Sequence, residues 1–331
     1  MAGSVVLTGA NSSLGLHAVE HIFTKYPQHT AILTVRDASD DDVNTKRLRE
    51  IISQHPNVKA SIHQLDLFSL AAVHDFSDTI IQSIMGGKYP PLISIICNAF
   101  YWNLFGDPEL TADGYDKTMQ VNYISQVALV LRLLGGFADV GRIILISSDA
   151  HWPGKNPMEK YPPSIPDDLE LLVKPAIDDD KYGRGYQRYA TSKLALTTWT
   201  HALNRYLQKD ESLNKLTAIA MNPGNMVDSR ALRSNTPQSM HRMQTFVYKP
   251  LLFLLRFTYP TLRTAAPAGA DVIEVAVSPA YSGEKGFFTL LKNDQSSPES
   301  NDEAKQTSLW AQTLVWANIN KNNTALQAGV V

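Results

Sequence analysis

The sequence is poor in cysteine, because Cys97 is the only one among 331 residues. A single thiol cannot form an internal disulfide, so we expect the chain to work in a reducing compartment and predict a cytoplasmic location. Cys97 ends the apolar run 92–97. This position favours a buried, structural thiol over a reactive one.

Long hydrophobic runs are also lacking. Residues 1–7 show no basic leader followed by an extended apolar region, which argues against a secretory signal peptide. The most apolar later stretch, 251–255, is followed by Arg256 and lies between Pro250 and Pro260. It is far too short for a membrane span. We expect a buried or lid helix here, with peripheral contact to a membrane or to a greasy substrate as the alternative.

Neither sign of charge is in excess, since 30 Lys and Arg stand against 32 Asp and Glu. This balance argues against a nucleic-acid partner, which would call for a basic face. The acidic runs 40–42 and 178–180 lack the ligand spacing of a metal site, so no metal is expected. No repeat and no Gly/Ser-rich or charged linker divides the chain, and residues 1–331 are therefore expected to form a single domain.

Apolar runs alternate with helical patterns through the first two-thirds of the chain. The expected strands are 5–9, 31–35, 60–67, 92–97, 141–148 and 216–224. The expected helices are 14–26, 45–54, 120–134 and 185–207. Continuous apolar strands separated by helices indicate a parallel sheet that is covered on both faces. The fold class is therefore α/β, with a doubly wound parallel sheet of the Rossmann type.

A glycine-bearing turn, 8–15, joins the first expected strand to the first expected helix. One glycine permits a tight turn after the strand, and the other permits close packing at the helix start. The exposed N–H groups of such a helix N-terminus bind a pyrophosphate. The candidate cofactor contacts in this turn are Gly9, Asn11, Ser12, Ser13, Leu14 and Gly15. Residues 1–150 are accordingly predicted to be mainly dinucleotide-binding.

Arg36 follows the second expected strand, where the choice of dinucleotide is made. An acidic residue at this place accepts bonds from the ribose 2′-OH of NAD, whereas an arginine pairs with the 2′-phosphate of NADP. Arg36 therefore favours NADP(H), and the neighbouring Asp37 leaves NAD(H) open as the alternative.

Tyr189 and Lys193 are four residues apart within the long helical segment. This spacing places both side chains on one face of the helix. A tyrosine ordinarily has a pKa near 10, and a neighbouring ammonium lowers it. The pair can then exchange a proton with an alcohol or carbonyl oxygen while a hydride moves to or from a nicotinamide.

Together these motifs resemble the short-chain dehydrogenase/reductase family. The phosphate turn departs from the family in one place, because Ser13 stands where the middle glycine is usual. The resemblance implies that Ser148 binds the substrate oxygen, with Ser147 as the alternative, and that Asn122 holds a water joining the lysine to solvent. It implies further cofactor contacts at Asp66, Leu67, Asn98, Ala99, Pro223 and Gly224, as well as Tyr189 and Lys193. Phe100 replaces a usual glycine and is expected to reshape the pocket beside the nicotinamide.

The later chain resembles the retinol dehydrogenase and WW-domain oxidoreductase branch of that family. The proline-rich segment 151–181 is predicted to form an active-site loop, and 225–262 a C-terminal substrate lid. The apolar side chains expected to line this lid are Met226, Met240, Met243, Phe246, Val247, Tyr248, Leu251, Leu252, Phe253 and Phe257. The alternative for each of them is packing on the core or on another subunit. Such a lining suits a bulky, apolar ketone, aldehyde or alcohol, such as a polyketide, terpenoid, sterol or retinoid-like compound of secondary metabolism.

The expected activity is thus an NADP(H)-dependent interconversion of a carbonyl and an alcohol. Two alternatives stay open at this point. The chain is otherwise a redox-neutral cyclase, dehydratase or isomerase on the same fold, or a non-catalytic dinucleotide-binding protein. The family often assembles through the tyrosine-bearing helix, whereas a large C-terminal extension would cover that face. Both a homodimer and a monomer are therefore compatible with the sequence.

Overall fold

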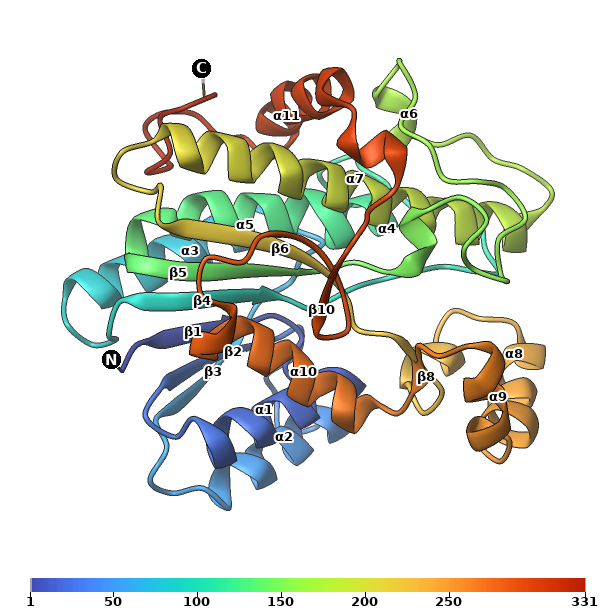
Figure 1. Cartoon of the computed structure of the whole chain (residues 1–331), viewed down its shortest axis with the longest axis horizontal. Helices are drawn as coiled ribbons and strands as arrows, with labels where there is room; N and C mark the ends of the chain where they lie inside the picture. The colour runs from blue at the N-terminus through green and yellow to red at the C-terminus, as the bar shows by residue number, and fades with distance from the viewer. Residues whose placement is uncertain (1, 331) are drawn as a thin grey trace.

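Eight strands form the central sheet of the computed structural model, which describes residues 2–330 (Figure 1). Neighbouring strands are parallel throughout, except for the antiparallel pair at the β10 edge. In spatial order the strands are β3 (Ala60–Gln64), β2 (Thr30–Val35), β1 (Ser4–Leu7), β4 (Leu92–Cys97), β5 (Phe137–Ile146), β6 (Leu216–Asn222), β9 (Gly286–Thr289) and β10 (Lys292–Asp294). The fold is the predicted doubly wound α/β architecture in one domain.

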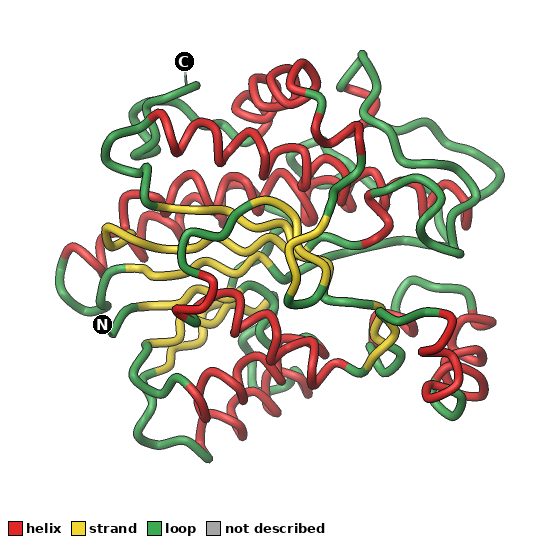
Figure 2. Tube along the Cα trace, viewed as in Figure 1, coloured by secondary structure: helices red, strands yellow, loops and turns green. Residues whose placement is uncertain are grey.

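Helices cover both faces of the sheet (Figure 2). On one face lie α1 (Ser13–Lys25), α2 (Val43–Ser53) and α10 (Ala265–Val277). On the other lie α3 (Leu70–Met85), α5 (Ser125–Leu133) and α7 (Lys181–Lys209). Because both faces are covered, the central strands are mainly apolar, and all six residues of β2 are buried.

Several helices begin where the sequence supplies a capping side chain. Ser12, Asp42 and Ser69 each accept a hydrogen bond from the backbone N–H three residues on, at the starts of α1, α2 and α3. Ahead of α5, a π-helical turn (Gln120–Ile124) follows the short helix α4 (Lys117–Met119). These caps fix where the chain turns from each strand into the next helix, at the edge of the sheet where the site lies.

The C-terminal helix α11 (Glu303–Trp316) packs on the outside of α7 (Figure 1). Trp310 stacks on Trp199 of α7 with 5.5 Å between ring centroids, and both indoles are buried. The Nε1 of Trp310 donates to the Gly329 carbonyl at 2.7 Å, which ties the chain end to the same cluster. The extension therefore covers part of the helix that bears Tyr189 and Lys193.

Two irregular regions flank the end of the sheet that carries the site. Residues 153–180 contain only a short helix, α6 (Glu170–Val173), because six prolines prevent a continuous one. The lid region consists of β7 (Asn225–Met226), a 3-10 turn (Arg230–Arg233), α8 (Gln238–Met243), a π-helical turn (Gln244–Tyr248), α9 (Leu252–Thr258) and β8 (Leu262–Arg263). In Figure 1, α8 and α9 lie together at one corner, away from the sheet. Across residues 2–330, no helix combines the length and apolarity that crossing a membrane requires.

The boundaries of several expected elements were wrong. Segment 60–67 contains the third strand as expected, over Ala60–Gln64, whereas the fifth strand begins four residues earlier than expected, at Phe137. The tyrosine-bearing helix is longer than predicted and runs over Lys181–Lys209, because Asp180 caps its start through the Gly183 N–H.

Candidate active site

The turn between β1 and α1 is built around a glycine that no other residue can replace. A Cβ on Gly15 would lie 2.4 Å from the carbonyl oxygen of Gly9 and 2.7 Å from that of Ala10. The Ser12 hydroxyl accepts from the Gly15 N–H at 2.9 Å and so caps the helix. Within the described chain, the first-turn amides of Ser13 and Leu14 donate to no protein acceptor. They remain available to an anion at this helix N-terminus.

Asn98 supports this turn from the neighbouring strand β4. Its Nδ2 donates to the carbonyl oxygens of Thr8 and Gly9, at 2.9 and 3.1 Å, and to the Ser12 hydroxyl at 3.1 Å. The Thr8 hydroxyl in turn accepts from the backbone N–H groups of Asn98 and Ala99. The side chain of Asn98 therefore holds the turn in place, and it would contribute to cofactor binding by positioning that turn.

The structure places Asn11 and Ser13 against other parts of the protein. The Asn11 Nδ2 donates to the carboxylate of Asp42 and to the hydroxyl of Thr45, at the start of α2. The Ser13 hydroxyl accepts from the backbone N–H of Arg230 at 3.0 Å, and the guanidinium of Arg230 donates to the Asn11 carbonyl. Arg230 belongs to the lid region and was not singled out from the sequence. No local pattern marks it, because its position depends on the lid returning to the turn.

Arg36 lies exposed directly after β2, beside the start of α2. The neighbouring Asp37 carboxylate accepts from the Ser39 N–H at 2.8 Å, and this bond lowers its pKa. One oxygen of Asp37 is thus used within its own turn, and Arg36 directly follows the end of the strand.

Asp66 and Leu67 follow β3, as the sequence predicts, but their contacts differ in kind. The Asp66 carboxylate accepts from the Phe68 N–H at 3.0 Å, and its side chain is half-buried. Leu67 is buried, and its carbonyl accepts from the hydroxyl of Ser125 at 2.8 Å. Leu67 is therefore anchored to α5, and the Asp66 carboxylate has a second oxygen left for a ligand.

Tyr189 of α7 meets Ser148 at the end of β5. The two side chains line the same pocket, and the Ser148 hydroxyl partly offsets the burial that raises the pKa of Tyr189 above its usual value. Ser147 points away from the tyrosine, because its hydroxyl forms a hydrogen bond of 2.8 Å with the hydroxyl of Thr197 on the buried side of α7. The geometry therefore assigns the hydroxyl beside the tyrosine to Ser148.

Lys193 lies one turn along α7 and is buried. Its Nζ donates to the Ile146 carbonyl at 2.7 Å and lies 5.7 Å from the Tyr189 ring centroid. Burial lowers the pKa of Lys193 to about 7. Burial is the largest cause of the raised pKa of Tyr189, and Lys193 is not among the groups that shift it.

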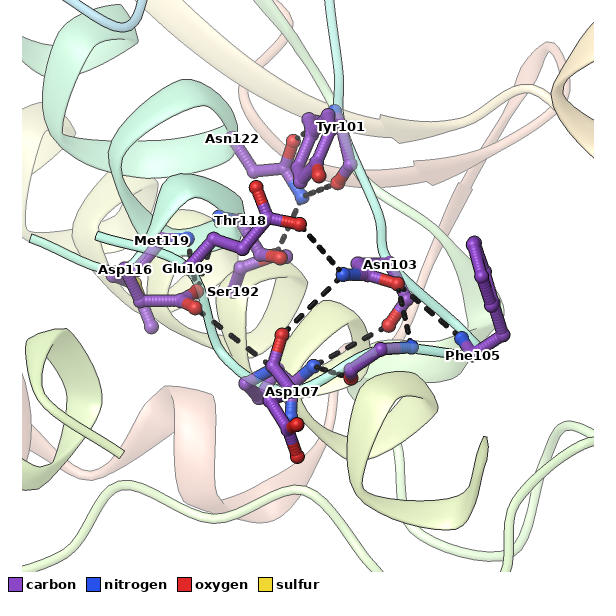
Figure 3. Close-up of polar contacts among 12 residues, drawn as sticks. Tyr101, Asn103, Phe105, Asp107, Glu109, Asp116, Thr118, Met119, Asn122 and Ser192 are labelled. Atoms are coloured by element: carbon purple, nitrogen blue, oxygen red, sulfur yellow. Dashed lines mark hydrogen bonds and ion pairs between the residues drawn. The ribbon is translucent and has the colours of Figure 1, made fainter. Parts of the chain in front are cut away.

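Asn122 lies in the π-helical turn and joins two segments of the site (Figure 3). Its Oδ1 accepts from the Tyr101 N–H at 2.7 Å, and its Nδ2 donates to the Tyr101 carbonyl and to the Ser192 hydroxyl, each at 2.9 Å. The amide of Asn122 is thus fully used in fixing the segment after β4 against α7. Figure 3 also shows Asn103 bonded to Glu109, which holds the next part of that segment.

Asp149 is a further polar residue of the site that the sequence analysis missed. Its Oδ1 accepts from the Ser148 hydroxyl at 3.0 Å and from the Asn156 Nδ2 at 2.9 Å. Its Oδ2 accepts from the Asn225 Nδ2 at 2.8 Å. One carboxylate therefore ties the end of β5 to the proline-rich segment and to the base of the lid. Its charge also contributes to the raised pKa of Tyr189, after burial.

The turn after β6 also faces the site. Gly224 has a φ of +86°, and a Cβ there would lie 2.5 Å from the carbonyl oxygen of Thr261 in the lid. Its N–H donates to the Asn222 Oδ1 at 3.0 Å. Pro223 and Gly224 therefore bring the sheet and the lid together at the point where the substrate chamber begins.

A pocket of about 580 Å³ opens in front of Tyr189 and Ser148. The sheet side contributes Phe100, Trp102 and Lys193, and the proline-rich segment contributes Trp152, Asn156 and Met158. The lid contributes Met226, Leu232, Tyr248, Leu255 and Tyr259. Phe100 lies 6.0 Å from the Tyr189 ring, centroid to centroid, and so forms a wall beside the candidate acid/base. This volume and its aromatic lining suit a bulky apolar molecule.

Most of the side chains expected to line the lid do not face this pocket. Of the ten, only Met226 and Tyr248 are among its lining residues. Six of the others are exposed to solvent: Met243, Phe246, Val247, Leu251, Phe253 and Phe257. The prediction was wrong for these six because apolarity alone does not say which side of a short helix faces the protein.

The residues at the β1–α1 turn fit a dinucleotide. Gly15 leaves no room for a side chain, the first-turn amides are available, and the turn is held rigidly by Asn98 and Ser12. A pyrophosphate there would place the rest of the cofactor along the strand ends toward Ser148 and Tyr189. The arrangement can bind an extended anionic cofactor beside a hydroxyl pair that is able to donate or accept one proton.

The match of known family models covers both halves of the chain. The short chain dehydrogenase model matches residues 4–163, and the model of the AcuH dehydrogenase domain matches residues 230–326. Short-chain dehydrogenase iccH from Talaromyces variabilis is 28% identical, over 98% of this chain and 98% of its own. Dehydrogenase acuH from Aspergillus aculeatus is 46% identical, over 28% of this chain and 94% of its own. The human WW domain-containing oxidoreductase is 27% identical over 93% of this chain and 66% of its own.

Solved structures share the fold at lower identity. The NADPH-bound carbonyl reductase from chicken fatty liver has a TM-score of 0.59 and 20% identity, covering 89% of this chain and 99% of its own. A short chain dehydrogenase from Burkholderia cenocepacia, in complex with NADP, has a TM-score of 0.58 and 19% identity. The match covers 86% of this chain and 95% of the Burkholderia chain. With the sequence matches, the glycine turn and the Ser148, Tyr189 and Lys193 cluster, these findings place the chain in the short-chain dehydrogenase/reductase family of oxidoreductases.

Proposed function

We propose that this chain is an NADP(H)-dependent oxidoreductase that interconverts a carbonyl and an alcohol on a bulky, mainly apolar substrate. The observation that carries the proposal is the placement of Tyr189, Ser148 and Lys193 along one pocket, with Lys193 buried one helical turn from the tyrosine. This is the arrangement a proton exchange at a substrate oxygen requires.

Tyr189 is the acid/base. In the reductive direction its hydroxyl gives a proton to the carbonyl oxygen, and in the oxidative direction it takes the proton of the alcohol. Ser148 hydrogen-bonds the same oxygen and stabilises its developing charge. When bound, the nicotinamide supplies or accepts the hydride. A carbonyl, one hydride and one proton thus give one alcohol, and the reverse reaction returns them.

Lys193 and Asn122 keep this pair in place. The Ile146 carbonyl holds the Lys193 Nζ 5.7 Å from the Tyr189 ring centroid, and the same amine would bind the cofactor ribose. Asn122 binds the segment after β4 to the helix that carries the tyrosine, and Ser192, next to Lys193, is its partner. Both residues are proposed as parts of the catalytic apparatus, together with Ser148 and Tyr189.

The cofactor contacts divide by the part of the dinucleotide they serve. Gly9, Ser12, Ser13, Leu14 and Gly15 shape the turn that receives the pyrophosphate, with Asn11 and Asn98 supporting it. Arg36 binds the 2′-phosphate, which makes NADP(H) the preferred cofactor. Asp66 and Leu67 lie on the adenine side, whereas Ala99, Pro223 and Gly224 lie on the nicotinamide side.

A substrate of polyketide, terpenoid, sterol or retinoid-like chemistry fits the aromatic pocket. Phe100, Trp102 and Trp152 supply flat apolar walls, and Asn156, Asn222 and Asn225 supply the few polar groups that orient a ligand. The similarity to the fungal dehydrogenases iccH and acuH supports a role in secondary metabolism.

The test follows the loss of NADPH absorbance with a panel of bulky apolar ketones and aldehydes, comparing the native protein with Tyr189→Phe. The variant should lose about 10²- to 10⁴-fold in kcat, the usual contribution of a general acid, while it binds NADPH as before. Thr24→Val, a surface change far from the pocket, is the matched control. If the native protein neither consumes NADPH with any carbonyl nor reduces NADP⁺ with the matching alcohols, the oxidoreductase proposal fails.

A further inference from the structure

The outer surface of the lid carries large apolar side chains that the fold leaves uncovered. Phe246, Phe253 and Phe257 are 74%, 75% and 78% exposed, respectively. Met243, Leu251 and Leu254 are also exposed. We call these six residues the outer lid face. Scattered apolar residues are normal on a protein surface, but six within fifteen positions form a cluster that marks a contact site.

The helices α8 and α9, which carry or adjoin these residues, lie together at one corner of the molecule (Figure 1). Phe253 and Phe257 are one turn apart on α9, and their rings meet edge to face with 5.7 Å between centroids. Met243 and Phe246 are three residues apart across the end of α8 and the π-helical turn that continues it. Because residues three and four apart share a helix face, each helix presents its apolar side chains together.

The charge of the lid is as distinctive as its apolarity. Residues 229–270 contain no Asp or Glu, although the whole chain has more acidic than basic residues. The same segment contains Arg230, Arg233, Arg242, Lys249, Arg256 and Arg263. Of these, Arg242, Lys249 and Arg256 are exposed and lie in the sequence between or beside the residues of the outer lid face. The lid thus combines exposed phenyl rings with positive charge only.

The inner side of the lid is firmly attached to the protein. Gln244 is fully buried, and its Nε2 donates to the carbonyls of Val227 and Ser229 at 3.0 and 2.8 Å. Its Oε1 accepts from the Arg233 Nε at 2.7 Å. Tyr248 and Leu255 on this side line the substrate pocket. The lid therefore already packs on the protein through its inner side, and the outer lid face takes no part in that packing.

Two occupants of such a face have to be weighed. In a symmetric dimer the same patch is present on both copies, so the basic side chains around it would face one another across the interface. This repulsion argues against a second copy. An anionic lipid surface instead complements both features, since it takes phenyl and leucyl groups into its interface and attracts lysine and arginine.

We infer that the outer lid face docks this protein on an anionic lipid surface, with Phe246, Phe253 and Phe257 entering the interface and Arg242, Lys249 and Arg256 meeting the headgroups. The pocket lies directly behind the same helices, with Tyr248, Leu255 and Tyr259 among its lining residues. Docking in this orientation brings the pocket to the source of an apolar substrate. The inference concerns binding to lipid and holds whether or not the proposed reaction is correct.

The test is sedimentation of the full-length protein with vesicles, in the absence of cofactor and substrate. Vesicles of phosphatidylcholine containing about a third phosphatidylserine should bind the protein, and vesicles of phosphatidylcholine alone should bind it at least tenfold more weakly, because each basic side chain contributes about fivefold. The double variant Phe253→Ser with Phe257→Ser should bind the anionic vesicles at least tenfold more weakly, since each buried phenyl group contributes about tenfold. Arg242→Glu with Lys249→Glu should show a loss of similar size that disappears at high salt.

The matched control is Val43→Ser with Met85→Ser, which removes two apolar side chains that are 77% and 83% exposed elsewhere on the protein. This control should bind like the native chain. Phe257→Trp adds a direct readout, because its fluorescence should shift to the blue with anionic vesicles. Equal binding by the phenylalanine variant and the control would overturn the inference. So would a native dimer that the phenylalanine variant converts to a monomer without any vesicle binding, which would identify a second copy as the occupant.

Discussion

Removing the guanidinium of Arg36 should change which dinucleotide the protein prefers. In Arg36→Ala the 2′-phosphate of NADPH loses a charge-assisted hydrogen bond, which is worth about 1.5–3 kcal/mol. Arg36 is exposed, so solvent and salt screen the interaction and the lower end applies. The expected effect is a Kd for NADPH that rises about tenfold, with little change in the Kd for NADH.

The structure also explains why the preference should weaken instead of reversing. One oxygen of the Asp37 carboxylate accepts from the Ser39 N–H, so only its other oxygen is left for a ribose 2′-OH. The guanidinium of Arg230 donates to the Asn11 carbonyl in the turn between β1 and α1. Burial is the largest cause that lowers the pKa of Arg230, and the nearby charge of Arg47 is the second. These two arginines keep the region cationic after Arg36 is removed, so part of the attraction for a phosphate persists.

The assay is a fluorescence titration of each variant with NADPH and with NADH. Arg242→Ala, which removes another exposed arginine on the lid, is the control and should leave both Kd values unchanged. An equal loss of affinity for the two cofactors in Arg36→Ala would refute the assignment, because it would mean that Arg36 acts on the shared part of the dinucleotide. An unchanged Kd for NADPH would refute it as well.

Three further substitutions test other parts of the site and fold. Gly15→Ala should abolish NADPH binding in titrations, because its Cβ would lie 2.4 Å from the Gly9 carbonyl oxygen; normal binding would show that the turn adapts. Burial lowers the pKa of Lys193 from 10.5 to about 7 in the folded protein. Between these two pH values the unfolded state binds the proton and the folded state does not, so the stability of the folded protein rises with pH across this window. Lys193→Met should remove that rise from urea denaturation followed at about pH 7 and about pH 9, and an identical pH dependence in both proteins would contradict the buried-ammonium argument. Trp310→Ala should lower the free energy of unfolding by about 3–5 kcal/mol, because it empties the stack on Trp199; a loss below about 1 kcal/mol would mean that α11 is not part of the core.

The sheet and the glycine turn could be predicted because they depend on short stretches of sequence. The central strands β2 and β4 are buried on both faces, so their apolar runs are nearly continuous, and both lie where the pattern puts them. The strands β9 and β10 were missed, because they are short and β10 is exposed throughout. An exposed edge strand carries no apolar run from which it could be recognised.

Residues of the candidate site could be predicted only where their type and their place in the local sequence together indicate one chemical role. Tyr189 and Lys193 are recognisable from their spacing, and Arg36 from its place after a strand. Asp149 and Arg230 are not, since their partners come from segments remote in the sequence: Asn225 for the first and Asn11 for the second. A carboxylate in a loop is usually solvated, and nothing local shows that two amides will converge on it.

The electrostatics of Tyr189 show the same limit and bear on its role. The four-residue spacing correctly implies a shared helix face, but it carries no information about burial, which raises the pKa of the phenol and lowers that of the ammonium. With Lys193 turned to the Ile146 carbonyl and Asp149 bonded to Ser148, the protein by itself keeps the proton on Tyr189 at neutral pH. A raised pKa makes the phenol a weaker acid, and donating its proton leaves the same buried phenolate that removes the proton of an alcohol in the reverse direction. Both directions of the proposed proton exchange therefore depend on a positive charge beside Tyr189, which a protonated Lys193 or the bound cofactor would supply.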